Sequence, residues 1–182
     1  MSGMLTAMKQ AAQLANSDYV YLVFAKTQIH NDFMFDYSPD YCSNPKNYIF
    51  YAYNPVLDYS YGHGSIVLYD KHWLLDVQEK DLRVDVTLSH EVEVVPEISC
   101  VNYFDSDWSA YRTAFREAYK LAQSQDITDK KRLKLWCESD RTQFGPASKK
   151  GACAGRKYAL EGGLFSNVNN WNWLKQQFES DQ

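Results

Sequence analysis

The sequence predicts a single α+β domain over residues 1–182, with a mainly antiparallel sheet and packed helices. Short apolar runs typical of strands occupy the N-terminal half, and apolar residues recur at helical spacing in the C-terminal half. No internal repeat and no linker-like stretch divides the chain. A chain of this length buries roughly 70% of its unfolded surface on folding, so a core can form without disulfides or a structural metal.

The N-terminal half begins with a helix and continues with strands. Met4, Leu5 and Met8 fall on one helical stripe, which predicts an amphipathic helix over residues 3–16. The short aromatic and β-branched runs YVYLVFA (19–25) and YIFYAY (48–53) predict buried strands. Residues 27–47, between these runs, follow neither period, and we expect a long functional loop there.

A β-hairpin is the next expected element. The runs GSIVLYD and HWLLDVQ flank a polar break at Asp70-Lys71, which we interpret as a two-residue turn. Alternating apolar and polar residues over 82–88 predict another strand, and Val92 begins a further one.

The C-terminal half reads as a series of helices. Helical spacing predicts one from Trp108 to Ala122 with Asp105 as N-cap, and we expect a second helix over 127–138. Residues 141–151 read as a loop, followed by a small-residue helix over 152–161 that ends at Gly162-Gly163. The last helix begins near Asn169.

Charge and termini exclude several classes of protein. The chain has 23 acidic and 19 basic side chains, a net charge of −4, and no basic run longer than Lys130-Lys131-Arg132. We therefore expect no nucleic-acid partner. The N-terminal residues fit neither a signal peptide nor a membrane span, so we expect no membrane insertion and a cytoplasmic location where the protein is made. Delivery outside the cell by a route that reads no cleavable signal is compatible with this.

The predicted hairpin brings a histidine and a carboxylate together. With a two-residue turn, His63 opposes Gln78 and Ser65 opposes Asp76, so Asp76 lies diagonal to His63 at roughly 7 to 8 Å between backbones. A carboxylate can hold an imidazole in the tautomer of a general base and stabilise the imidazolium that forms. A three-residue turn would remove this pairing.

Cys153 is the candidate nucleophile. It lies at the predicted start of a helix after Ser148-Lys149-Lys150-Gly151, where helix N–H groups and cations lower a thiol's pKa and offer donors to an oxyanion. Small residues would let this helix approach a sheet closely: Ala152, Ala154, Gly155 and Ala159. Cys42 and Cys137 are alternative reactive thiols, and Cys100 is expected in the core; all four are expected to be free.

These residues resemble a known family. His63 in YGHGSIVLYD, Asp76 in WLLDVQ and Cys153 in GACAGRKYALEGG follow the order of the circularly permuted branch of the NlpC-type papain-like superfamily, which includes the lecithin retinol acyltransferase-like proteins. The resemblance implies a papain-like fold with permuted His-then-Cys order and a Cys-His-Asp relay. The chain departs from the pattern after the cysteine, where it has Ala-Gly-Arg in place of Ser-Glu or Glu-His.

Tyrosine is concentrated in the N-terminal half, with 10 of 14 between Tyr19 and Tyr69. Four lie in loops that carry Asp, Asn and Pro: Tyr37, Tyr41, Tyr59 and Tyr61. The segment 28–62 carries four aspartates against Lys46, a local charge of −3. We expect Tyr37, Tyr59 and Tyr61, together with Gln78, to bind the substrate or a protein partner.

Two functions follow from these expectations. The first is a papain-like cysteine hydrolase or acyltransferase that acts on an amide bond of a peptide, peptidoglycan stem or isopeptide, without cofactor or metal. The second is a non-catalytic protein-binding inhibitor or immunity-type protein that uses its Tyr- and Asp-rich loops. A zinc site formed by His63, His72, His90 and a cysteine is not expected, because their spacing matches no known ligand pattern.

Overall fold

The computed structural model describes residues 2–25, 27–40, 46–78 and 91–181. Its contacts divide the chain into two compact units. The N-terminal unit comprises Met1–Asn54 and Ser60–Tyr103, and the helical unit comprises Pro55–Tyr59 and Phe104–Gln182. The expected single domain stays a prediction.

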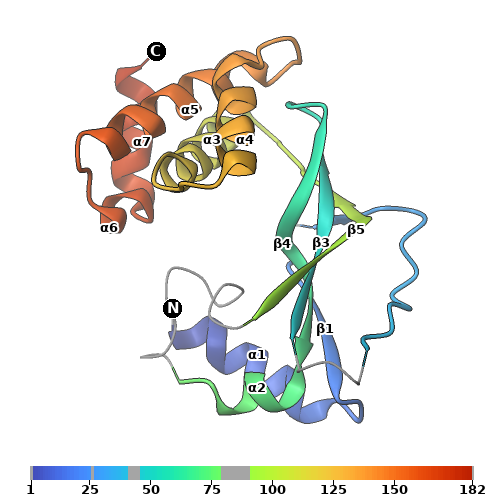
Figure 1. The fold of residues 1–182 in the computed structure, drawn as a ribbon. Helices are drawn as coiled ribbons and strands as arrows, with labels where there is room; N and C mark the ends of the chain where they lie inside the picture. Colours follow the sequence, from blue (N-terminus) through green and yellow to red (C-terminus); the bar gives the residue numbers. More distant parts are fainter. Residues whose placement is uncertain (1, 26, 41–45, 79–90, 182) are drawn as a thin grey trace. The chain divides into compact units, whose positions relative to one another are not determined.

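The N-terminal unit contains a mixed five-stranded sheet in the order β1-β4-β3-β5-β2 (Figure 1). The strands are β1 (Tyr19–Val23), β2 (Gln28–Ile29), β3 (Asn47–Asn54), β4 (Tyr59–Asp70) and β5 (Val92–Val101). Pairs β1–β4 and β2–β5 are antiparallel, whereas β3–β5 is parallel. The α+β class is confirmed, but the mainly antiparallel sheet is wrong, because β5 follows a crossover and runs alongside β3 in the same direction.

The predicted hairpin after Gly64 is also wrong. Only its first run is a strand, and Lys71–Asp76 form the helix α2. Asp70 caps this helix, since its carboxylate accepts a hydrogen bond from the Trp73 backbone N–H at 2.8 Å. The Tyr69 and Trp73 rings stack with centroids 6.1 Å apart, and Leu74 is fully buried. Helix capping and burial of one helical face thus override the apolar run that suggested a strand.

Helices α1 (Ser2–Leu14) and α2 cover one face of the sheet (Figure 1). Lys9 Nζ donates to the Leu75 carbonyl at 2.6 Å, and Lys71 Nζ donates to the Ala15 carbonyl at 2.7 Å, which ties the two helices together. The core on this face consists of Leu5, Met8, Ala12, Ile49, Val67, Tyr69, Leu74 and Val77. Alternation along β4 places residues 67 and 69 on one face and residues 66 and 68 on the other.

The opposite face of the sheet is covered by the segment that follows β2. Phe33 is 6% exposed and packs against Phe50 with ring centroids 5.1 Å apart. Tyr37 packs on Tyr48 at 5.1 Å. Ile66, Leu68, Val95 and Cys100 complete this core. The predicted long loop is thus anchored by its aromatic residues; residues 41–45 of it, and the strand predicted at 82–88, lie outside the described residues.

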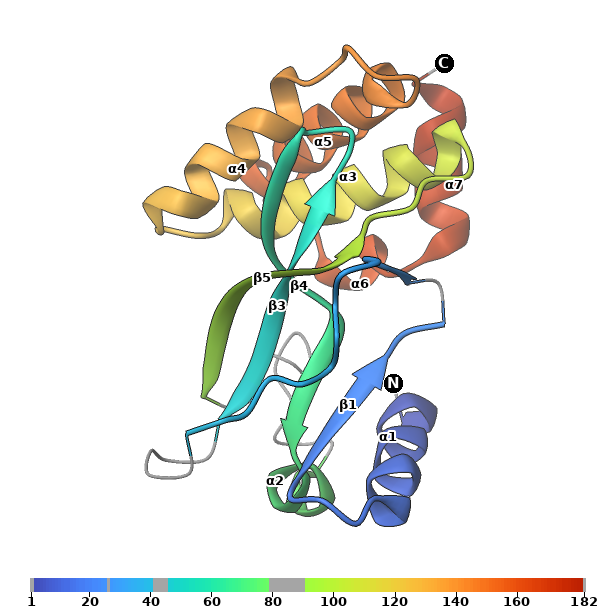
Figure 2. The same ribbon diagram turned by 90° about the vertical axis from the view of Figure 1, so that its right-hand side faces the viewer.

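The helical unit contains five helices in the described residues (Figure 2). They are α3 (Asp107–Ala122), α4 (Ile127–Glu138), α5 (Gly145–Leu160), α6 (Phe165–Val168) and α7 (Trp171–Ser180). Tyr111, Phe115, Tyr119, Val168 and Leu174 form their core. The predicted helices over 108–122 and 127–138 are confirmed, although the N-cap of α3 is Ser106 rather than Asp105, with a reciprocal capping box to Ser109.

Helix α5 differs from its prediction in start and partner. It begins at Gly145, seven residues before the expected position, with Pro146 in its first turn. It packs on α3 rather than on a sheet. The contact is close because a Cβ at Gly151 or Gly155 would meet the backbone of Tyr111 or Phe115. The small residues noted in the sequence therefore serve a helix–helix contact.

Candidate functional site

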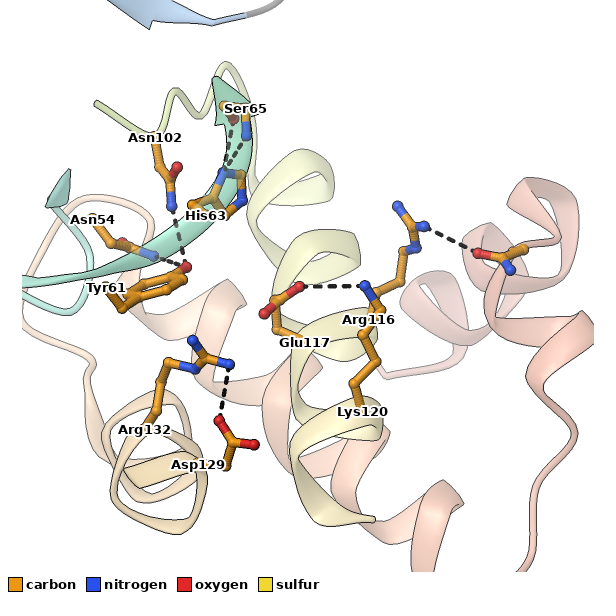
Figure 3. Close-up of polar contacts among 11 residues, drawn as sticks. Asn54, Tyr61, His63, Ser65, Asn102, Arg116, Glu117, Lys120, Asp129 and Arg132 are labelled. Carbon is orange, nitrogen blue, oxygen red and sulfur yellow. Dashed lines mark hydrogen bonds and ion pairs between the residues drawn. The ribbon is translucent and has the colours of Figure 1, made fainter. Parts of the chain in front are cut away.

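His63 lies in β4 and is half-buried. Its Nδ1 is 2.8 Å from the Ser65 hydroxyl and accepts a hydrogen bond from the Ser65 backbone N–H at 3.2 Å (Figure 3). Because a backbone N–H can only donate, the neutral imidazole carries its proton on Nε2. The lone pair that a general base would use is therefore already engaged by Ser65.

Asp76 does not meet His63 in the N-terminal unit. It is the exposed last residue of α2, which begins after Asp70. The strand from His63 to Asp70 spans about 23 Å and α2 spans about 9 Å, so the two backbones lie at least about 14 Å apart. The expected cross-strand contact is wrong, because the residues that carry Asp76 form a helix. Gln78 is exposed and donates to the Asp76 carbonyl at 2.8 Å.

Tyr61 is a buried strand residue rather than a loop residue. It is 6% exposed, and its hydroxyl accepts hydrogen bonds from the side-chain amides of Asn54 at 3.4 Å and Asn102 at 3.2 Å. Figure 3 shows both amides directed at this hydroxyl. Its ring centroid lies 6.0 Å from that of His63. Asn54 ends β3, and Asn102 directly follows β5. Neither was selected from the sequence, because the sequence does not show that these two strand ends lie close together.

The other predicted contact tyrosines differ in exposure. Tyr59 is 39% exposed and belongs to the helical unit. Tyr37 is half-buried in the segment that follows β2, where it packs on the sheet. Burial, together with the Glu93 charge, raises the pKa of its hydroxyl. Tyr41 lies outside the described residues.

Cys153 lies inside α5 and not at its N-terminus. It is the ninth residue of a helix that begins at Gly145, so the free N–H groups of the first turn are not beside its thiol. Its side chain is exposed, and Sγ lies 3.9 Å from the Cys137 carbonyl of α4. Cys153 belongs to the helical unit, whereas His63 and Asp76 belong to the N-terminal unit. The pairing of Cys153 with His63 stays a prediction, without Asp76 as the orienting carboxylate.

Two other cysteines have distinct surroundings. Cys100 is 1% exposed, which confirms its expected place in the core, and burial raises its thiol pKa. Cys137 is half-buried; burial, the neighbouring Cys153 charge and a hydrogen bond to Cys153 raise its pKa to about 11, against a smaller effect of Arg156. Cys42 lies outside the described residues.

The turn at Met34 and Phe35 is a surface feature that the sequence analysis missed. Met34 is 70% exposed, and Phe35, 37% exposed, has φ 57° in the left-handed region. An aromatic residue adopts this conformation at a cost of about 1 to 2 kcal/mol, so its surroundings must hold it. The sequence NDFMFD, in which two aspartates flank three apolar residues, is the pattern that could have indicated this turn.

Among the described residues, no three or more His, Cys, Asp or Glu side chains gather as a metal site would require. In the same part of the chain, no helix has the length and apolar character needed to span a membrane. No family model, no curated protein and no solved structure matches this chain. The resemblance to the NlpC-type superfamily therefore stays a prediction.

Proposed function

We propose that the chain is a non-catalytic protein-binding module that presents the turn at Met34 and Phe35 to a basic partner protein. The observation that carries this proposal is the exposure of two large apolar side chains on a turn that is anchored on both sides. Phe33 precedes the turn in the core, and Tyr37 follows it on the sheet. An apolar side chain that is held outward on a fixed backbone suits insertion into a partner's pocket.

The surroundings of the turn are acidic. Asp32, Asp36 and Asp40 are exposed along the same segment. Beneath it, burial raises the pKa of the Tyr21 hydroxyl to about 12, and the charges of Glu97 and Asp36 contribute to this rise. The three exposed aspartates therefore make the surroundings of the turn negative.

The net charges of the two units support the same choice of partner. The N-terminal unit holds 12 acidic and 6 basic residues, a net charge of −6, whereas the helical unit holds 11 acidic and 13 basic residues, a net charge of +2. A cationic protein surface would be attracted to the N-terminal unit, and such attraction speeds association at low salt. A basic surface with an apolar pocket for Met34 is the partner that this chemistry favours, as in an inhibitor or immunity-type complex.

Site-specific photo-crosslinking tests the proposal. A photoreactive amino acid replaces Met34 in one variant and Ile127 in another; both side chains are 70% exposed, and Ile127 lies in the helical unit. We expect position 34 to give one discrete crosslinked protein. Unlabelled wild-type chain should compete with this product, and added salt should lower its yield. Position 127 should give no such product. A product from position 127 alone would overturn the proposal.

A cysteine variant separates binding from catalysis. With the chain kept fully reduced, we expect Cys153→Ala to leave the position-34 crosslink and every associated biological effect unchanged. Loss of the biological effect in the reduced chain, with crosslinking intact, would contradict the non-catalytic proposal and favour the cysteine hydrolase.

A further inference from the structure

Cys137 and Cys153 form a pair of neighbouring thiols within the helical unit. Cys137 is near the end of α4, and Cys153 lies in the middle of α5. The Cys153 thiol lies 3.9 Å from the Cys137 carbonyl oxygen, and Cys153 is close enough to add to the rise in the Cys137 pKa that burial causes. Both are free cysteines. The 15 residues between them thus bring two reducing groups into contact.

The two thiols differ in access. Cys153 is exposed and lines a surface cavity of about 410 Å³, while Cys137 is half-buried behind it. A reagent from solution therefore meets Cys153 first. Nucleophilic attack requires the thiolate, and the raised pKa of Cys137 disfavours its thiolate at neutral pH.

Cations surround the exposed thiol. Arg156 and Lys157 line the same cavity, together with Leu160 and Glu161. Lys149, one turn before Cys153, also interacts with its charge, although it forms a 2.7 Å ion pair with Asp140. Lys157 lies 3.9 Å from Glu161, so the lining keeps a net charge of +1 through Arg156, which favours a small molecule that carries carboxylates.

We propose that Cys137 and Cys153 are a reversible dithiol–disulfide site that is oxidised by a small anionic disulfide of the glutathione class. The Cys153 thiolate attacks one sulfur of the small disulfide, its S–S bond breaks, and one small thiolate leaves. A mixed disulfide then occupies Cys153.

Cys137 completes the exchange. Once Cys153 is in the mixed disulfide, its charge no longer opposes ionisation of Cys137, while Arg156 still favours it. The Cys137 thiolate attacks the Cys153 sulfur and releases the second small thiol. The protein loses two protons and two electrons, and the small disulfide gains both as it becomes two thiols. Disulfides of this transient kind are compatible with a reducing compartment.

Mass spectrometry of the full chain tests this site. The reduced chain is incubated with oxidised glutathione, quenched with acid, and alkylated after denaturation. We expect two of its four cysteines to escape alkylation and peptide mapping to join Cys137 to Cys153. Full alkylation of both residues at every glutathione ratio, or a disulfide joining either one to Cys42 or Cys100, would overturn the proposal.

Two serine variants test the order of steps. In Cys137→Ser the mixed disulfide cannot be resolved, so we expect one glutathione adduct to accumulate at Cys153. In Cys153→Ser we expect Cys137 to acquire the adduct at least about tenfold more slowly, since it is the less accessible thiol. Equal rates of adduct formation in the two variants would contradict the assigned order. Cys42→Ser serves as the matched control and is expected to form the Cys137–Cys153 disulfide at the wild-type rate.

Discussion

The ring of Phe35 stands edge-on against the ring of Tyr21, with 5.2 Å between the centroids and 85° between the planes. A second edge contact joins Phe35 to Phe33 at 4.7 Å. These contacts hold an aromatic residue at φ 57° and so fix the turn that presents Met34. The backbone of this turn is maintained by packing beneath it.

Substitutions of Phe35 separate the ring contacts from the backbone conformation. Phe35→Ala and Phe35→Gly both lose the ring contacts, but only glycine adopts φ 57° without steric cost. We expect Phe35→Gly to be more stable than Phe35→Ala by about 1 kcal/mol, measured by urea unfolding. A more stable alanine variant would contradict a fixed left-handed turn.

Substitutions of two helical glycines should change stability in opposite directions. Gly151→Ala would place a Cβ against the Tyr111 backbone, which cannot move aside as a side chain can, and we expect a loss of about 1 to 3 kcal/mol. Gly3→Ala, in α1, meets nothing within 4 Å and should gain up to about 1 kcal/mol from helix propensity. Urea unfolding measures both; a neutral Gly151→Ala would contradict the close contact between α3 and α5.

The sequence predicted the helices and strands better than it predicted their partners. Periodicity located α3, and β-branched aromatic runs located β1 and β3. The run HWLLDVQ misled because an apolar segment of that length suits a strand or a helix, and the cap formed by Asp70 decides for the helix. The glycines of α5 showed that a close contact exists but gave no information on whether a sheet or α3 provides it.

The candidate site was harder to predict, because it depends on tertiary contacts. His63 was correctly placed on a strand, but Ser65 as its hydrogen-bond partner follows only from the side-chain geometry. The meeting of Cys137 with Cys153 depends on how α4 crosses α5. Exposure of Met34 depends on a single left-handed residue, and no periodicity encodes that conformation.

The protonation state of His63 provides a spectroscopic test. Because Nδ1 accepts the Ser65 backbone N–H, we expect the neutral side chain to be the Nε2–H tautomer. Long-range nitrogen–proton NMR spectra of the labelled imidazole distinguish the two tautomers. Ser65→Ala removes only the hydroxyl and should keep the Nε2–H form, whereas a dominant Nδ1–H form in the wild-type chain would refute the hydrogen-bond assignment.

Acid should destabilise the helical unit through two carboxylates. Hydrogen bonds from the Thr128 and Asp129 backbones lower the pKa of Asp126, and Lys149 lowers that of Asp140, both below the ordinary 3.8. A lowered folded-state pKa stabilises the fold above the unfolded pKa, and this contribution is lost as pH falls through the folded value. We expect the Tm to drop below pH about 4.

Asparagine variants isolate this effect. Asn caps a helix about as well as Asp but does not titrate, so Asp126→Asn with Asp140→Asn should flatten the fall in Tm between neutral and acidic pH. The thermal transition followed by circular dichroism measures the difference from the wild-type chain. An unchanged acid response in the double variant would assign the loss to other carboxylates.

The binding proposal is tested most directly by the affinity of the chain for the protein that crosslinks at position 34. Calorimetry compares the wild type with Met34→Ser and with the matched control Ile127→Ser, both side chains being 70% exposed. Our account predicts at least about tenfold weaker binding for Met34→Ser, as expected for a central apolar anchor, with Ile127→Ser unchanged and the affinity falling with salt. Wild-type affinity for Met34→Ser together with a loss for Ile127→Ser would contradict it.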